Sequence, residues 1–243
     1  TFIGKTAVDD TAEVLLDQAA AERAGPELCL VPEETARHLD AQRFSIEEDL
    51  DQADYILGIS ELIEFAGPKF KAYRRRASRF RREVDATITC LDLGNAATVA
   101  AMVDLYMHWE HMKRESGHDV SPMIWGNEFP VFERLLASHD CFSLLATGIW
   151  SAGRLIAFHV TEILTGGYAM VHFMKADTEA FPDVCQVLLQ EAAKALQARG
   201  CIFLNYQEDG GIPALRAAKL RYRPVTFLRS YTVRRASVTS GTA

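Results

Sequence analysis

Apolar residues recur with regular periods along the second half of the chain. Positions 99, 102, 103, 106 and 109 are spaced as on one face of a helix, which predicts an amphipathic helix over residues 98–114. Asn127 is the predicted N-cap of the next helix. Three alternating segments separated by short turns then predict a meander: residues 142–150, 155–164 and 168–175. The elements predicted after it are a helix over residues 184–199, a strand over residues 201–206, a helix that begins at Pro213 and is ended by Pro224, and a strand over residues 224–233.

The first half gives a looser pattern of the same kind. The predicted strands are residues 2–5, 28–31, 55–59 and 87–93, and the predicted helices are residues 10–24, 33–39, 61–66 and 69–82. Strands and helices mixed in this way predict an α+β fold with a mixed sheet. We expect an N-terminal lobe over residues 1–94 and a C-terminal lobe over residues 95–236. Residues 237–243 are small and polar, which predicts a flexible tail.

Composition narrows the class of protein. The 243 residues are 49% hydrophobic and 24% charged, which is typical of a globular protein with a core. No apolar run reaches the ~20 residues of a membrane-spanning helix, so no span is expected. The five cysteines are scattered and form no CxxC pair. We therefore expect no metal site, a reducing environment and a cytoplasmic location.

Charge is distributed unevenly behind the net value of −7. Residues 1–68 contain 16 acidic and four basic residues, whereas residues 69–82 and 216–235 contain basic residues and no acid. Such clusters predict a local anionic partner. Within the first cluster, the candidates for binding nucleic acid or another anion are Lys71, Arg74, Arg75 and Arg79. The alternative is a solvated cationic helix that balances the acidic segment.

Residues 205–224 combine acids, glycines and bases around one turn. Glu208 and Asp209 precede two glycines and a helix that begins at Pro213, and Arg216 and Lys219 lie on one face of that helix. In one interpretation the acids cap the helix and pair with these bases. In the other, the acids hold an ammonium group while the bases hold an anion. The residue pattern leaves both open.

The meander adds three candidate ligand-binding residues and one argument about cofactors. His159, His172 and Lys175 are placed at a pocket wall, with a structural role as the alternative for the histidines. Residues 175–183 follow the third strand and contain three acids and no glycine. Such a loop is a poor cradle for a diphosphate, so acetyl-CoA is disfavoured and no cofactor is expected.

Two groups of residues resemble a known family, the catalytic domain of phosphatidylglycerol lysyltransferases. The first group matches its C-terminal motif: Asn205, Glu208, Asp209, Gly211, Leu215, Arg216, Lys219, Tyr222 and Pro224. The second matches an upstream basic region: Asp54, Tyr55, Gly67, Lys71, Arg74 and Phe80. The likeness covers about residues 50–233. The order of elements is also similar to that of the GNAT superfamily, which implies a GNAT-like fold with two tandem lobes.

The resemblance implies an acyltransferase that moves an aminoacyl group from aminoacyl-tRNA to a hydroxyl or amine. The implied acceptor is an anionic small molecule or a lipid headgroup. Glu208 and Asp209 would bind the amino group or accept a proton, and Arg216 and Lys219 would stabilise anionic groups. The implied substrate-binding residues are Asn205, Tyr206, Tyr222 and Arg223, beside His159, His172 and Lys175. The alternatives are a CoA-dependent N-acyltransferase and a degenerate protein that binds an anionic ligand.

Overall fold

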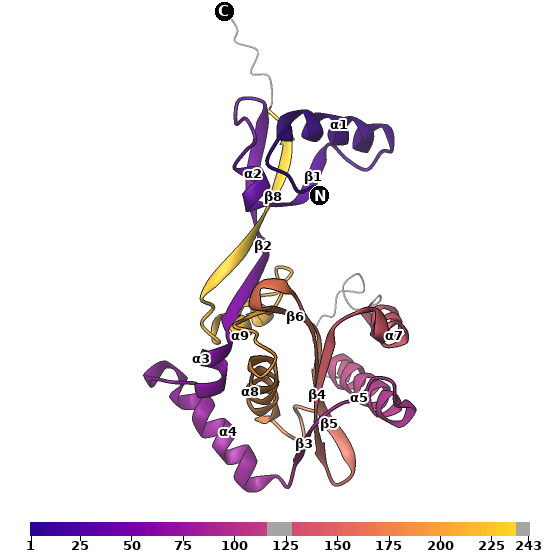
Figure 1. Cartoon of the computed structure of the whole chain (residues 1–243), viewed down its shortest axis with the longest axis vertical. Coiled ribbons are helices and arrows are strands. Elements are labelled where there is room, and N and C mark those ends of the chain that lie inside the picture. The colour runs from indigo at the N-terminus through magenta and orange to yellow at the C-terminus, as the bar shows by residue number, and fades with distance from the viewer. Residues whose placement is uncertain (116–127, 237–243) are drawn as a thin grey trace, which may run out of the picture. The chain divides into compact units, whose positions relative to one another are not determined.

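The computed structural model describes residues 1–115 and 128–236, which form two compact units (Figure 1). One unit combines Thr1–Ile56 with Tyr206–Ala243, and the other is Leu57–Asn205. The expected division at residues 94 and 95 does not coincide with a boundary of these units. The reason is that the last strand pairs with strands from the first 60 residues, so both ends of the chain join one unit.

Three strands form the sheet of the first unit. The strand β8 (Thr226–Arg235) lies between β1 (Glu27–Pro32) and β2 (Phe44–Gly58) and is antiparallel to both. The helices of this unit are α1 (Val8–Ala21), α2 (Glu33–Ala36) and α9 (Pro213–Leu220). Its core consists of buried apolar side chains of α1, α2 and the strands: Val8, Ala12, Leu16, Leu28, Val31, Ala36, Leu39, Phe44 and Val233.

Two expectations for this unit were wrong. Residues 2–5 form no strand, and β2 begins at Phe44 rather than at residue 55. The acidic run 47–51 has low intrinsic strand propensity. It is nevertheless extended because β8 presents basic side chains opposite it. Glu47 and Glu48 form ion pairs with Arg234 and Arg229. Cross-strand charge pairing of this kind outweighs the local preference.

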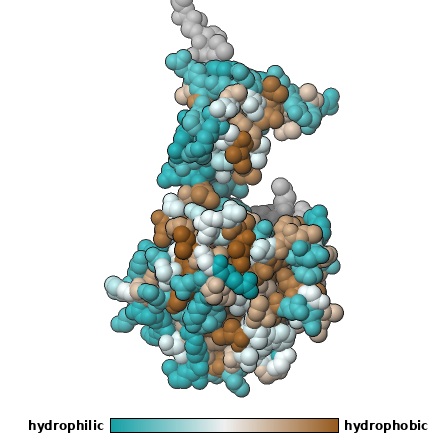
Figure 2. Space-filling model, viewed as in Figure 1, coloured by the Kyte–Doolittle hydropathy of each residue, from teal (hydrophilic) through white to brown (hydrophobic). Residues whose placement is uncertain are grey.

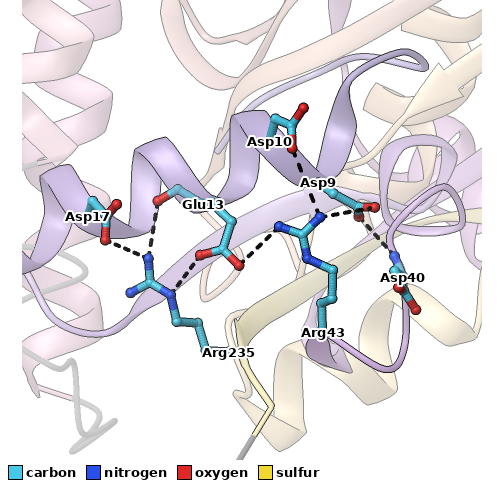
Figure 3. Close-up of polar contacts among 7 residues, drawn as sticks. All are labelled: Asp9, Asp10, Glu13, Asp17, Asp40, Arg43 and Arg235. Atoms are coloured by element: carbon cyan, nitrogen blue, oxygen red, sulfur yellow. Dashed lines mark hydrogen bonds and ion pairs between the residues drawn. The ribbon is translucent and has the colours of Figure 1, made fainter.

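The acidic α1 is also neutralised from within its own unit (Figure 3). The Arg235 Nε lies 2.8 Å from an oxygen of Glu13, and its Nη2 lies 2.6 Å from Asp17. The Arg43 guanidinium lies within 4.0 Å of Asp9, Asp10 and Glu13. Acids and bases that are far apart in the sequence therefore form ion pairs, and those of Arg235 hold the end of β8 against α1.

The second unit contains a five-stranded arrangement in the order β7-β6-β5-β4-β3. Its strands are β3 (Thr87–Cys90), β4 (Leu144–Ser151), β5 (Arg154–Ile163), β6 (Tyr168–Ala176) and β7 (Phe203–Asn205). Neighbours are antiparallel from β3 to β6, as the predicted meander requires, and β6 and β7 are parallel. Short 3-10 turns occur at Pro68–Phe70, His139–Cys141 and Thr165–Gly167.

Helices cover both faces of these strands (Figure 1). On one face lie α5 (Ala96–Glu115) and α7 (Glu128–Ala137), which enclose a core that includes Phe132 and Phe158. On the other lie α4 (Lys71–Glu83) and α8 (Val184–Gln197), with Phe80, Ile156 and Leu188 between them and the strands. The short α3 (Ile59–Glu64) also packs on α8.

The mixed α/β class and the predicted order of elements are confirmed from α5 to β8. A tandem pair of GNAT-like lobes is not established by these units and stays a prediction. The predicted cap at Asn127 and the tail 237–243 lie outside the described residues. Within residues 1–115 and 128–236, no helix combines the length and the apolar character needed to cross a bilayer.

Candidate functional site

The turn between β7 and α9 is built around the buried carboxylate of Asp209, which is 1% exposed. Its Oδ2 accepts hydrogen bonds from the Tyr55 hydroxyl and from Arg216 Nε, the latter at 2.8 Å. Its Oδ1 accepts from Arg216 Nη2 at 2.8 Å and from the Gly211 amide at 2.9 Å. Burial alone would raise the pKa of Asp209, but these donors outweigh it and the pKa is lowered.

Lys219, one residue before the end of α9, also binds the loop between β7 and α9. Its ammonium donates to the backbone carbonyls of Tyr206, at 2.7 Å, and Glu208. The side chain is 7% exposed and its nitrogen lies 5.2 Å from the centre of the Tyr206 ring. Burial lowers the pKa of Lys219 to about 8. Two hydrogen bonds of this ammonium are therefore made to backbone carbonyls of the turn rather than to the side chain of Glu208 or Asp209.

Arg216 also binds groups of the protein, in its case two carboxylates. Besides its bidentate contact with Asp209, its Nη2 lies 2.6 Å from Asp51 Oδ1 on β2. A fork-to-fork arginine–carboxylate contact fixes both geometry and charge. Of the two interpretations that the sequence left open, the pairing of Asp209 with Arg216 is the one found.

Glu208 differs from its neighbour. Its side chain is half-buried, and among the described residues its carboxylate takes part in no hydrogen bond or ion pair. The backbone on both sides is held, because the Glu208 carbonyl accepts from Lys219 and Asp209 is clamped by Arg216. The turn therefore presents one unpaired carboxylate on a fixed backbone.

Local sequence explains why the chain turns here. Gly211 has φ of +74°, and a Cβ at this position would meet the Asp51 carboxylate at 2.8 Å. Only glycine combines that backbone conformation with so close an approach. Pro213 then occupies the first turn of α9, where its missing N–H costs nothing.

The other residues expected at this turn have different surroundings. The Tyr206 and Tyr222 rings pack edge to face at 5.7 Å, and Tyr222 is buried. Arg223 is exposed and has a left-handed backbone with φ of 57°. Asn205 ends β7 in the second unit, where it is buried beside Met170 of β6.

The structure does not bring the three meander residues together. Neighbouring positions on β5 point to opposite faces, and Phe158 faces α5 and α7 opposite Lys175. His159 is therefore directed to the other face and is 0% exposed. Its Nδ1 lies 2.7 Å from Thr161 Oγ1. Burial lowers the pKa of His159 to about 4, so its structural interpretation is favoured over a place on a pocket wall.

His172 and Lys175 each contact a carboxylate. His172 Nε2 lies 2.8 Å from Glu162 on β5. Lys175 is 4% exposed, and its ammonium lies 2.7 Å from Glu128 and 3.5 Å from the centre of the Trp109 ring. Burial lowers the pKa of Lys175 to about 8 even though Glu128 favours the charged form. This ammonium is thus enclosed by a carboxylate and an aromatic face.

The basic helix α4 is only partly available to a partner. Arg74 donates to the carbonyls of Phe65 and Gly67, and Arg79 Nε donates to Asp183 Oδ2 at 2.6 Å. Lys71 and Arg75 are exposed and form no ion pair with any described residue. Where α4 lies in Figure 1, the surface in Figure 2 is largely hydrophilic. Two of the four candidate anion-binding side chains therefore serve the fold.

The loop after β6 holds two of its three acids inside the protein, whereas Glu179 is exposed. Asp177 and Asp183 are 2% and 6% exposed. Asp183 stands at the start of α8, the position at which a diphosphate would meet backbone amides. Its carboxylate pairs with Arg79 there. That acetyl-CoA is disfavoured as donor stays a prediction, and the acidic side chain at this position agrees with it.

Several residues of these clusters were missed as site residues. Tyr55 was recognised only through its likeness to the family, and Asp51 lies in the acidic N-terminal segment, for which no site was predicted. Glu128 and Trp109 carried no signal, because only the fold brings α5, α7 and β6 together. Within the described ranges, no three His, Cys, Asp or Glu side chains gather as metal ligands would.

The sequence and the fold were compared with those of known proteins. The sequence matches the family described as "Phosphatidylglycerol lysyltransferase, C-terminal" over residues 3–234. No curated protein sequence matches the chain at a significant level. A conserved protein of unknown function from Bacteroides thetaiotaomicron is 26% identical with a TM-score of 0.79, and the match covers 94% of this chain and 75% of that one.

Two further solved structures share the fold. The C-terminal domain of a putative lysylphosphatidylglycerol synthetase from Agrobacterium fabrum is 12% identical with a TM-score of 0.64, over 93% of this chain and 72% of its own. L-PGS from Bacillus licheniformis is 13% identical with a TM-score of 0.63, over 93% of this chain and 73% of its own. The family match spans both compact units and includes the whole 205–224 motif. The chain therefore belongs to the family of phosphatidylglycerol lysyltransferase C-terminal domains.

Proposed function

We propose that the chain transfers an aminoacyl group from aminoacyl-tRNA to a hydroxyl or amine acceptor. Membership of the family supports acyl transfer of the phosphatidylglycerol lysyltransferase type. In the proposed reaction the acceptor oxygen or nitrogen attacks the ester carbonyl of the aminoacyl-tRNA. The ribose oxygen leaves with a proton, and the new ester or amide keeps the aminoacyl group.

The unpaired carboxylate of Glu208 is the observation on which this proposal rests. The Glu208 carboxylate is half-buried, forms no hydrogen bond or ion pair with a described residue, and interacts with Lys219 only through its charge. Its oxygens can therefore accept hydrogen bonds from the ammonium of an aminoacyl group. Its backbone is fixed by Lys219 and by the Asp209–Arg216 pair, so the point from which the Glu208 side chain extends is held in place. Such positioning is a principal source of rate enhancement in a transfer reaction. Glu208 would bind and orient the donor, whereas Asp209, Arg216 and Lys219 would position Glu208.

Two surfaces support the proposed classes of donor and acceptor, one for each. On α4, a recess of about 610 Å³ is lined by Arg75, Arg76, Ser78, Arg79 and Arg82. Arg76, Arg79 and Arg82 have acidic partners, so Arg75, exposed and without an ion pair among the described residues, is the guanidinium best suited to an RNA phosphate. On the first unit, Leu220 and Val225 are 44% and 47% exposed and flank the exposed Arg221 and Arg223. Apolar and cationic groups so close in the chain favour an anionic amphiphile, such as a lipid headgroup with its apolar part, as acceptor.

The test compares Glu208→Gln with wild type in the transfer of labelled amino acid from aminoacyl-tRNA to lipid extract and to hydroxyl or amine acceptors. We expect transfer by the wild type and a loss of about tenfold or more in kcat/KM for the variant, because a charge-assisted hydrogen bond to the donor is lost. Glu133→Gln is the matched control, since Glu133 is an exposed residue of α7. Full activity of a folded Glu208→Gln protein would contradict the proposed role.

A further inference from the structure

A recess of about 340 Å³ lies in the second unit, between α5 and the β4–β5 hairpin. Its volume is near the lower end of the range for small-molecule sites. Both polar and apolar side chains line it, and none of them belongs to the 205–224 turn: Asp104, Leu105, His108, Trp150, Arg154 and Leu155.

The cationic part of this recess is organised by Asp177, a buried carboxylate at the end of β6. Its Oδ2 lies 2.7 Å from Arg154 Nη2 and 3.3 Å from His108 Nε2. Its Oδ1 accepts from the Ala180 amide at 3.1 Å. One carboxylate thus holds an arginine and a histidine side by side at the recess, although the two come from different elements.

Arg154 retains binding capacity after this contact. Its side chain is 54% exposed, and Asp177 is its only polar partner among the described residues. The His108 side chain is 40% exposed. The guanidinium therefore has N–H groups left to donate, and a small carboxylate is the anion whose planar shape matches them.

The same recess is also lined by an acid without an ion pair among the described residues, Asp104. Asp104 is exposed and has no ion pair or hydrogen bond with any described side chain. It lies one helical turn before His108 on the same face of α5, which separates the two side chains by about 5–6 Å at Cβ. Asp104 and Arg154 both line the recess, and their opposite charges complement a small zwitterion.

The apolar part of the recess is rigid. Leu105 and Leu155 are buried in the core beneath it. Trp150 Nε1 donates to Thr89 Oγ1 at 3.0 Å, which fixes the orientation of the indole. A fixed aromatic face beside two leucines suits an aliphatic or aromatic side chain of the ligand.

We propose that this recess binds a free α-amino acid with an apolar side chain. Its carboxylate contacts Arg154 and His108, its ammonium contacts Asp104, and its side chain packs on Trp150. The recess is separate from the proposed transfer site, and the inference does not rest on the proposed function. A free amino acid bound here is a ligand in its own right and not the aminoacyl group of the donor.

The first experiment measures binding to wild-type protein by calorimetry, without tRNA. L-leucine and L-phenylalanine are the probes, and isocaproate and L-leucinamide are the analogues of leucine that lack the ammonium and the free carboxylate. We expect saturable binding of at least one amino acid, and about tenfold or greater loss for each analogue of leucine when leucine binds. No binding of either amino acid at millimolar concentration would overturn the proposal.

The second experiment locates the site. Arg154→Gln should weaken amino-acid binding while leaving leucinamide binding unchanged, and Asp104→Asn should weaken it while leaving isocaproate binding unchanged. Arg199→Gln and Asp140→Asn remove the same charges from exposed positions outside the recess and should have no effect. Equal affinities in all four variants would place the ligand elsewhere and refute the proposal. Because Arg154→Gln removes a partner of Asp177, the analogue series on wild-type protein decides the question if that variant does not fold.

Discussion

Acidification should destabilise the second unit through one residue, His159. Its side chain is 0% exposed, its Nδ1 contacts Thr161, and its Nε2 has no hydrogen-bond partner among the described residues. A proton on this imidazole would place a charge in the core without a counter-ion. Burial accordingly lowers the pKa of His159 from 6.5 to about 4.

The size of the effect follows from the two pKa values. In the unfolded chain the histidine takes up its proton near pH 6.5, whereas the folded protein resists protonation until about pH 4. Between these values the unfolded state binds more protons, so the free energy of unfolding falls as pH falls. At ~1.4 kcal/mol per pH unit, this shift contributes about 3 kcal/mol, fully present above pH 6.5 and lost as pH falls through about 4.

The assay is urea unfolding at a series of pH values, followed by tryptophan fluorescence. Trp109 and Trp150, the tryptophans that the structure describes, both belong to the second unit, so their signal reports on its unfolding. Carboxylates also titrate in this range, and the comparison of wild type with His159→Leu isolates the histidine. We expect the wild type to lose about 3 kcal/mol more than the variant between pH 7 and pH 4. Equal losses, or an imidazole whose NMR signals titrate near pH 6.5 in the folded protein, would refute the reasoning.

Two further predictions concern the other charged clusters. Asp209→Ala should lower the free energy of unfolding by about 2–3 kcal/mol, because the Tyr55 hydroxyl and the Gly211 amide lose their buried acceptor; far-UV circular dichroism in urea measures this, and an unchanged midpoint would contradict it. Lys71→Ala with Arg75→Ala should reduce the slope of log affinity for tRNA against log salt by about 0.7–0.9 per lost phosphate contact. Arg199→Ala is the control, and a slope unchanged by the double substitution would remove α4 from the proposed RNA contact.

Periodicity in the sequence predicted the elements whose stability is local. The helical spacing over α5 reflects the face that it buries against the strands, and the apolar segments of the meander reflect strands that are covered on both faces; all were placed within a few residues. Pro213 also marked the start of α9. These signals depend on neighbours in the chain, which a sequence displays directly.

The division into units could not be predicted, because it depends on β8. This strand pairs with β1 and β2, about 200 residues earlier in the chain, and its basic residues neutralise acids there. Likewise, the burial of His159 and the enclosure of Lys175 follow from the register of β5 against β6 and from the helices on each face. Register between strands is set by tertiary packing, so a single sequence does not reveal it.

The basic clusters show how this limit affects functional inference. Sequence alone treats each cationic run as available to an anionic partner. In the structure, Arg216, Arg229, Arg234 and Arg235 are paired with acids of the same unit. On α4, ion pairs with acids cover Arg76, Arg79, Arg81 and Arg82, whereas Lys71 and Arg75 are exposed and form no ion pair with a described residue. The free energy gained from an anionic ligand is largest where no internal carboxylate must first be displaced. The inference of an anionic partner therefore narrows from two clusters to α4 and to the exposed pair Arg221 and Arg223.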